Sequence, residues 1–267
     1  MDESVVQGAK NVVVRCLQAT PGETVHILGY KAGDLVALFE RAVDEAGAKS
    51  NVIDLEPLVK DGATVAEYAS TLAPLLSGAT ASILVAPERP PPVLSVALAK
   101  TAESVKSRHL HLLQVDERLL MTSVRAEPDL LAIVNERVTS ALTPPCTVRV
   151  TSDAGTSLEV QLDPRHPVLS SSGRPAPGTS ENLPAGHVFV HPSRVTGTLV
   201  VDRAIFGPTA HIERQRLRKP PARVVFAGGR LAGFEAADDD VRAAIDAYLA
   251  SHVNANRVGL AVFPTNY

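Results

Sequence analysis

Two pairs of histidines are the residues whose type and spacing could support metal chemistry. His109 and His111 lie two positions apart in an apolar run. On a strand, both side chains would point the same way at a spacing of about 6 to 7 Å, and such a pair can share a metal ion. No third ligand is apparent, although Asp116 and Glu117 follow. The simpler interpretation is a partly exposed strand start beside Arg108.

The second pair, His187 and His191, also falls on one face of an expected strand. Four strand residues separate the Cα atoms by about 13 Å, so the two imidazoles cannot bind one ion together. Either histidine could still join a site of two histidines and one carboxylate whose other ligands come from elsewhere. Because no such ligands are in view, the sequence predicts neither a metal site nor catalytic residues.

Motifs for nucleophilic or nucleotide chemistry are missing from the sequence. It contains no G-x-S-x-G elbow, no P-loop, and no G-x-G-x-x-G after the first expected strand, where TVHILGYKAGD stands instead. Tyr30, Lys31 and Asp34 fall at the carboxyl end of that strand, where doubly wound sheets present ligands. Position alone identifies no ligand, and the sequence predicts no cofactor.

The composition is that of a folded protein whose partners are neither nucleic acid nor membrane. Its 267 residues, 45% apolar and 21% charged, can bury one or two cores. A net charge of −3 gives no basic field for a phosphate backbone. Neither a secretory signal nor a run of about 20 apolar residues is present, so a cytoplasmic setting is expected. Cys16 and Cys146 are expected to be buried apolar residues. The one cationic cluster, interpreted as a solvated strand face, comprises Arg214, Arg216, Arg218, Lys219 and Arg223.

In the first half, short apolar runs alternate with helical patterns, which indicates an α/β fold of strands and crossover helices in a mostly parallel sheet. Right-handed crossovers would place the helices on both faces. The sequence thus predicts a Rossmann-like domain over residues 1–145. Strands are expected at 24–30, 51–55, 81–86 and 108–115, and helices at 31–48, 63–76, 93–107 and in segments up to about 142.

The pattern changes at Pro144 and Pro145, where we expect the boundary to a second, β-rich α+β domain of residues 146–267. The stretch 163–183 is rich in Pro, Ser and Gly and is expected to be a long loop; such loops usually serve function or are mobile. A terminal helix is expected at 238–252. The expected strands are 147–151 and 157–162, which form a hairpin, then 187–191, 198–206, 223–226, 230–235 and 257–263.

Several segments carry a family resemblance. The more specific ones are TSDAGTSLEVQL, NLPAGHVFVHP with GTLVVD, and the terminal RVGLAVFPTN. PGETVHILGY and the following helix, which ends in DEAGA, match more loosely. Together they cover most of the chain and resemble the thermophilic aminopeptidase (aminopeptidase T) family and its relative, 2,5-dihydroxypyridine dioxygenase.

The resemblance implies metal ligands at positions where this sequence departs from the family. In the aminopeptidases, NLPAGHVF would carry a glutamate where His187 stands, whereas the dioxygenases have a histidine there. The glutamate expected in RVGLAVFPTN is Leu260, which cannot bind a metal. Family members continue through a C-terminal portion with the remaining ligands, including a His-x-Asp pair, so a truncated member is expected. Since catalytic metal sites need about three protein ligands, neither peptidase nor dioxygenase activity is expected.

A chain that resembles this family but lacks its ligands is expected to work by recognition. The family cleft is shaped for an extended peptide, and open strand edges are templates for a guest strand. The chain also resembles truncated relatives in the crocagin ribosomal-peptide (RiPP) pathway, which bind precursor peptide for partner enzymes. The sequence therefore predicts a peptide-binding pseudoenzyme that recognises a precursor or leader peptide, assists a tailoring enzyme and forms a homodimer, as relatives do. Asn182, His187, His191 and Arg194 are expected to bind the peptide beside the 163–183 loop.

Two alternatives stay open. A residual metal-dependent enzyme would combine His187 with His166, His211 or Asp202, or with ligands from a partner subunit. Stoichiometric iron or zinc that is lost on His187→Ala would favour it. A structural subunit of a larger complex would instead pair its open edge with a second copy or a full-length enzyme, and would give no heat with a synthetic precursor peptide.

Overall fold

The computed structural model describes residues 2–206, 211–212, 217 and 220–266. It consists of two compact units. Unit 1 comprises Met1–Arg137, Ser170–His187 and Pro264–Tyr267, and unit 2 comprises Val138–Leu169 and Val188–Phe263. The sequence predicts one boundary after residue 145; in the structure the chain leaves unit 1 after Arg137 and returns to it twice.

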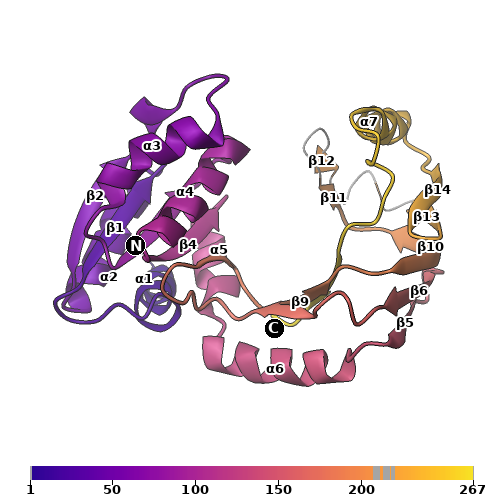
Figure 1. The fold of residues 1–267 in the computed structure, drawn as a ribbon, viewed down its shortest axis with the longest axis horizontal. Helices are drawn as coiled ribbons and strands as arrows, with labels where there is room; N and C mark the ends of the chain where they lie inside the picture. The colour runs from indigo at the N-terminus through magenta and orange to yellow at the C-terminus, as the bar shows by residue number, and fades with distance from the viewer. Residues whose placement is uncertain (1, 207–210, 213–216, 218–219, 267) are drawn as a thin grey trace. The chain divides into compact units, whose positions relative to one another are not determined.

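Unit 1 is built on a five-stranded parallel sheet with the order β2-β1-β3-β4-β8 (Figure 1). Four of its strands confirm the predicted parallel sheet. The fifth, β8, lies within the stretch that was expected to be a loop, and this expectation was wrong. β8 pairs with β4, which lies far earlier in the chain, so no local sequence pattern reports the pairing. The strands are β1 (Thr24–Gly29), β2 (Lys49–Asp54), β3 (Ala81–Ala86), β4 (Arg108–Leu113) and β8 (Ser180–Leu183).

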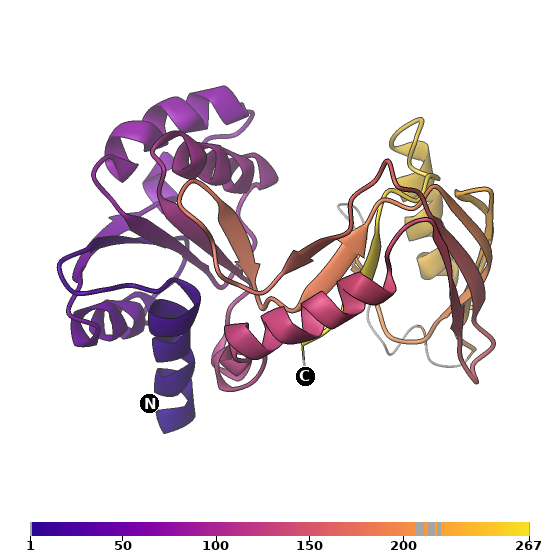
Figure 2. The same ribbon diagram turned by 60° about the horizontal axis from the view of Figure 1, so that its bottom comes forward.

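Helices cover both faces of this sheet, as predicted (Figures 1 and 2). Because successive strand residues point to opposite faces, Ile27 and Ile83 join the core with α1 and α2, whereas Leu28 and Leu84 join the core with α3 and α4. α3 begins with a capping box. The helices are α1 (Glu3–Lys10), α2 (Leu35–Glu45), α3 (Val65–Leu76), α4 (Pro92–Ser104), α5 (Glu117–Met121) and α6 (Pro128–Ala141).

The N-terminal helix packs unusually close to α5. α1 continues into a π-helical stretch at Asn11–Cys16. A Cβ added at Gly8 would lie 2.0 Å from the carbonyl oxygen of Leu120. Gly8 is buried, so this approach of two backbones requires glycine. Cys16 is buried as expected, whereas Cys146 is only half-buried.

Unit 2 contains a five-stranded antiparallel sheet with the order β14-β13-β10-β6-β5, which confirms the β-rich second half. The expected strand 198–206 is interrupted: β10 starts earlier and ends at Val201, and a short strand follows at Ile205. α7 (Asp239–Ala250) lies beside β13 and β14 (Figure 1). The strands are β5 (Cys146–Thr151), β6 (Ser157–Leu162), β10 (Arg194–Val201), β11 (Ile205–Phe206), β12 (His211–Ile212), β13 (Ala222–Ala227) and β14 (Arg230–Glu235).

A smaller sheet has the order β15-β9-β7, with β7 (Leu169–Ser171), β9 (His187–Val190) and β15 (Ala261–Pro264). Of the predicted cationic cluster, Arg223 is exposed on β13, while Arg214, Arg216, Arg218 and Lys219 lie outside the described residues. None of the described helices combines the length and the apolar character that crossing a bilayer requires.

Candidate ligand-binding site

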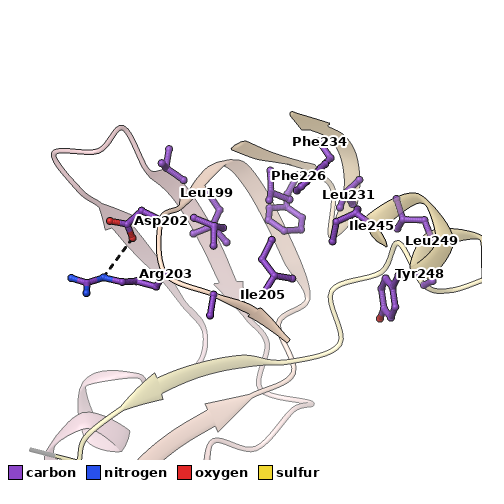
Figure 3. A pocket seen from close by; sticks show the side chains of 15 residues that line it. Leu199, Asp202, Arg203, Ile205, Phe226, Leu231, Phe234, Ile245, Tyr248 and Leu249 are labelled. Carbon is purple, nitrogen blue, oxygen red and sulfur yellow. Dashed lines mark ion pairs between the residues drawn. The ribbon is translucent and has the colours of Figure 1, made fainter. Parts of the chain in front are cut away.

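A cavity of about 540 Å³ lies within unit 2 (Figure 3). Four elements form it: the end of β10 with the segment that follows to Ile205, then β13, β14 and α7. Its volume falls within the roughly 300–1,000 Å³ that is usual for small-ligand pockets. The cavity is therefore large enough to hold a small molecule or several peptide side chains.

The lining is apolar because each element turns its apolar residues toward the cavity. On β13, Val224 and Phe226 are two positions apart and share one face of the sheet. On α7, Ile245, Tyr248 and Leu249 follow the i, i+3, i+4 spacing of a single helix face. Apolar side chains from a strand pair and a helix thus meet around one space.

Polar groups are confined to parts of the lining. Asp202 and Arg203 form an ion pair with a nitrogen-to-oxygen distance of 3.8 Å, and both are exposed. Figure 3 shows this pair on one side of the apolar side chains and Tyr248 on the other. Such an arrangement can bury apolar groups while charged and hydroxyl groups contact the polar parts of a ligand.

Sequence reasoning missed this cavity. The signals were present separately: the apolar stripe of the terminal helix, and the run LVVDRAIF at residues 199–206. Nothing in either segment shows that they face the same space, because β10, β13 and α7 are brought together only by the fold.

The four residues that the sequence predicts as peptide-binding fall in both units, and none lines the cavity. Asn182 and His187 belong to unit 1, and His191 and Arg194 to unit 2. Asn182 lies on β8, the last strand in the order of its sheet, where its Oδ1 is 3.2 Å from Nδ1 of His111.

The other three residues have different environments. His187 is half-buried on the central strand of the small sheet, and burial lowers its pKa. His191 is exposed, and its Nδ1 hydrogen-bonds the carbonyl oxygen of Gly259. Arg194 is exposed at the start of β10, opposite Gln161 of β6. The peptide-binding role of these residues remains a prediction.

His109 and His111 face the same way, as expected, with ring centroids 4.5 Å apart. The interpretation of a partly exposed strand start was wrong, because both side chains are buried. β4 has partners on both sides, β3 and β8, and β8 was not foreseen. Nδ1 of His109 is 2.7 Å from the hydroxyl of Ser82. Burial lowers the pKa of both histidines, that of His111 to about 4.

The side chains that could bind a metal do not fit the three-ligand site that the family resemblance implies. Within the described parts of the chain, no group of three or more His, Cys, Asp or Glu side chains is placed to hold a metal ion. Asp116 and Glu117 do not complete a site with the buried histidine pair, nor do Asp202 and His166 with His187. The side chain of His211 lies outside what the structure describes.

Solved structures of other proteins have a similar fold over nearly the whole of this chain. A 2,5-dihydroxypyridine dioxygenase from Pseudomonas putida KT2440 superposes with a TM-score of 0.71 at 16% identity, over 97% of this chain and 75% of that one. AmpT from Thermus thermophilus gives 0.65 at 15% identity, over 98% of this chain and 78% of that one. No curated protein matches the sequence.

Residues 5–211 match the family described as NicX, 2,5-dihydroxypyridine 5,6-dioxygenase, and the chain belongs to this family. The resemblance to the dioxygenase and aminopeptidase family is thereby confirmed. The prediction that the chain is not an enzyme was wrong, because the family to which it belongs is an enzyme family. The resemblance to proteins of the crocagin pathway stays a prediction.

Proposed function

We propose that this chain binds a precursor or leader peptide of a ribosomal-peptide pathway, and that the cavity of unit 2 receives apolar side chains of that peptide. The observation that carries the proposal is the cavity itself: about 540 Å³ lined mainly by aliphatic and aromatic side chains. A peptide can insert two or three apolar side chains into such a space while its backbone stays outside.

The free energy gained by burying apolar side chains in the cavity would supply only part of the binding affinity. Burying one large apolar side chain contributes about 1.5–3 kcal/mol, while ordering a flexible peptide costs about 2–5 kcal/mol. Three buried side chains then leave a few kcal/mol, whereas micromolar binding needs about 8 kcal/mol. Polar contacts must contribute the rest, and we propose Asn182, His187, His191 and Arg194 for this role.

A cavity-filling substitution tests the proposal. Ala204 lines the cavity, so Ala204→Trp places an indole in the space that the peptide side chains would occupy. We expect binding of a synthetic precursor peptide to weaken at least about 30-fold, since roughly 2 kcal/mol of apolar burial is lost. Calorimetry measures the change.

The matched control is Ala227→Trp, which makes the same substitution at an exposed position of β13 that does not line the cavity. It should bind the peptide as the unmodified protein does. Equal affinity of both variants would show that the peptide binds elsewhere, and no heat with the unmodified protein would refute peptide binding.

A second function is favoured by one observation, the match of residues 5–211 to a dioxygenase family. In this case the chain, loaded with ferrous iron, would consume oxygen in the presence of 2,5-dihydroxypyridine. His187→Ala is the informative variant, because the family resemblance places a metal ligand at this position. Oxygen uptake that depends on His187 would support a site rebuilt around this residue; uptake equal to a protein-free control would refute it.

A further inference from the structure

Aromatic side chains are concentrated at the cavity of unit 2. The chain has six Phe, four Tyr and no Trp. Three of these ten aromatic residues, Phe226, Phe234 and Tyr248, lie among the 15 residues that line the cavity. An even distribution over the 267 residues would place fewer than one aromatic residue there. The lining is thus rich in aromatic groups in a chain that has few of them.

The cores of the protein are built from aliphatic side chains instead. Among the described residues, eleven of the twelve largest fully buried side chains are Leu or Ile, and the other is Phe39. Packing of the interior therefore does not account for three aromatic residues at one cavity. A role in contacting a ligand accounts for them, because aromatic side chains offer a large and rigid contact area.

The three rings come from three different elements and keep surface that a ligand can contact. Phe226 lies on β13, Phe234 on β14 and Tyr248 on α7 (Figure 3). Each side chain is half-buried, and within the described part of the chain none of the three rings contacts another aromatic ring. Aromatic rings favour edge-to-face or offset partners with centroids about 4.5–7 Å apart. A ring that enters the cavity can supply this partner.

We propose that the cavity selects an aromatic side chain of the bound peptide over an aliphatic one. This inference rests on the proposed function, because it names the class of side chain that the same cavity receives. The space is sufficient: an apolar cavity of about 150 Å³ already holds a benzene ring, and this cavity has about 540 Å³. Each edge-to-face pair strengthens binding about 2- to 12-fold beyond the effect of the buried area.

Fluorescence titration tests the inference, because the protein contains no Trp and an indole signal comes from the ligand alone. The probe is N-acetyl-tryptophanamide, and N-acetyl-leucinamide competes with it. We expect the indole emission to shift to the blue on binding, and the tryptophan compound to bind at least about fivefold more tightly than the leucine compound. Phe226→Leu and Phe234→Leu should each reduce this preference at least about twofold. The matched control, Phe263→Leu on β15, removes a ring outside the lining and should retain the preference.

A measurement on the unmodified protein guards against variants that fold poorly. Two-dimensional NMR should show nuclear Overhauser contacts between the indole protons of the probe and the ring protons of Phe226, Phe234 or Tyr248. The inference is overturned if the probe does not bind, if the leucine compound binds as tightly, if the preference is the same in all three variants, or if the contacts fall on rings outside the cavity.

The inference and the proposed function fail in different ways. A precursor peptide that binds as well after its aromatic residues are replaced by leucine, and still loses affinity in Ala204→Trp, would refute the aromatic selectivity and leave peptide binding intact. A probe that binds with the expected preference, together with a precursor peptide that gives no heat, would refute peptide binding alone.

Discussion

Acidification from pH 7 to pH 4.5 is expected to destabilise unit 1, and protonation of His111 alone contributes an amount on the order of 3 kcal/mol. Burial lowers the pKa of His111 from 6.5 to about 4. The unfolded chain therefore takes up a proton near pH 6.5, which the folded chain accepts only near pH 4. The contribution of His111 to the free energy of unfolding is constant at pH values above the pKa of this histidine in the unfolded chain. It falls as the pH decreases from 6.5 to 4.

Other buried groups of unit 1 modify this dependence. Burial also lowers the pKa values of His26, His109 and His187, and protonation of these histidines in acid destabilises the folded unit in the same way. Burial raises the pKa of Glu181, so protonation of this carboxyl stabilises the folded state as the pH falls and opposes part of the effect. The net result is still a loss of stability in acid, because protonation of four histidines destabilises the folded unit 1 and protonation of one carboxyl stabilises it.

Urea unfolding at a series of pH values, followed by circular dichroism, measures this effect. His111→Gln, which removes one titrating imidazole, is expected to make the pH dependence of the unfolding free energy shallower between pH 6.5 and 4.5, whatever its stability at pH 7. His252→Gln is the matched control and should retain the acid-sensitive transition, since it removes an exposed histidine. A protein equally stable at pH 7 and pH 4.5 would contradict the buried, neutral histidines.

Gly8→Ala is expected to lower the free energy of unfolding by about 3 kcal/mol or more. The added methyl carbon would lie 2.0 Å from the carbonyl oxygen of Leu120 and 2.7 Å from its carbonyl carbon, so α1 and α5 must move apart. The better helix propensity of alanine, about 1 kcal/mol, offsets only part of this cost.

Chemical denaturation quantifies the loss. The same substitution at Gly259, where an added methyl carbon meets no atom within 4 Å, serves as the control and should leave the unfolding midpoint within the experimental error. Unchanged stability of Gly8→Ala would mean that the two helices are farther apart than the structure places them.

Features encoded by local periodicity could be predicted from the sequence. The six apolar residues ASILVA predict a strand buried on both faces, and β3 has these bounds, Ala81–Ala86. The hairpin around Asp153 and Gly155 was likewise visible, because alternation on both sides of a turn is a local pattern. The family resemblance, carried by short motifs, is confirmed by the match over residues 5–211.

Features that depend on distant pairing could not be predicted. β8 is four residues long and lies in a stretch rich in Pro, Ser and Gly, and only its pairing with β4 makes it a strand. The burial of His109 and His111 follows from that pairing, so it was missed as well. The cavity needs β10, β13, β14 and α7 to converge, and the close approach of Gly8 to Leu120 needs α1 to pack on α5.

The proposed peptide site is tested most directly by photo-crosslinking. A precursor peptide carrying photoreactive leucine at each apolar position in turn would be irradiated with the protein, and the attached residues identified by mass spectrometry. We expect crosslinks to residues of β13, β14 and α7 that line the cavity, such as Phe226, Phe234 and Tyr248. Crosslinks confined to unit 1, or none above those of a scrambled peptide, would contradict the proposal.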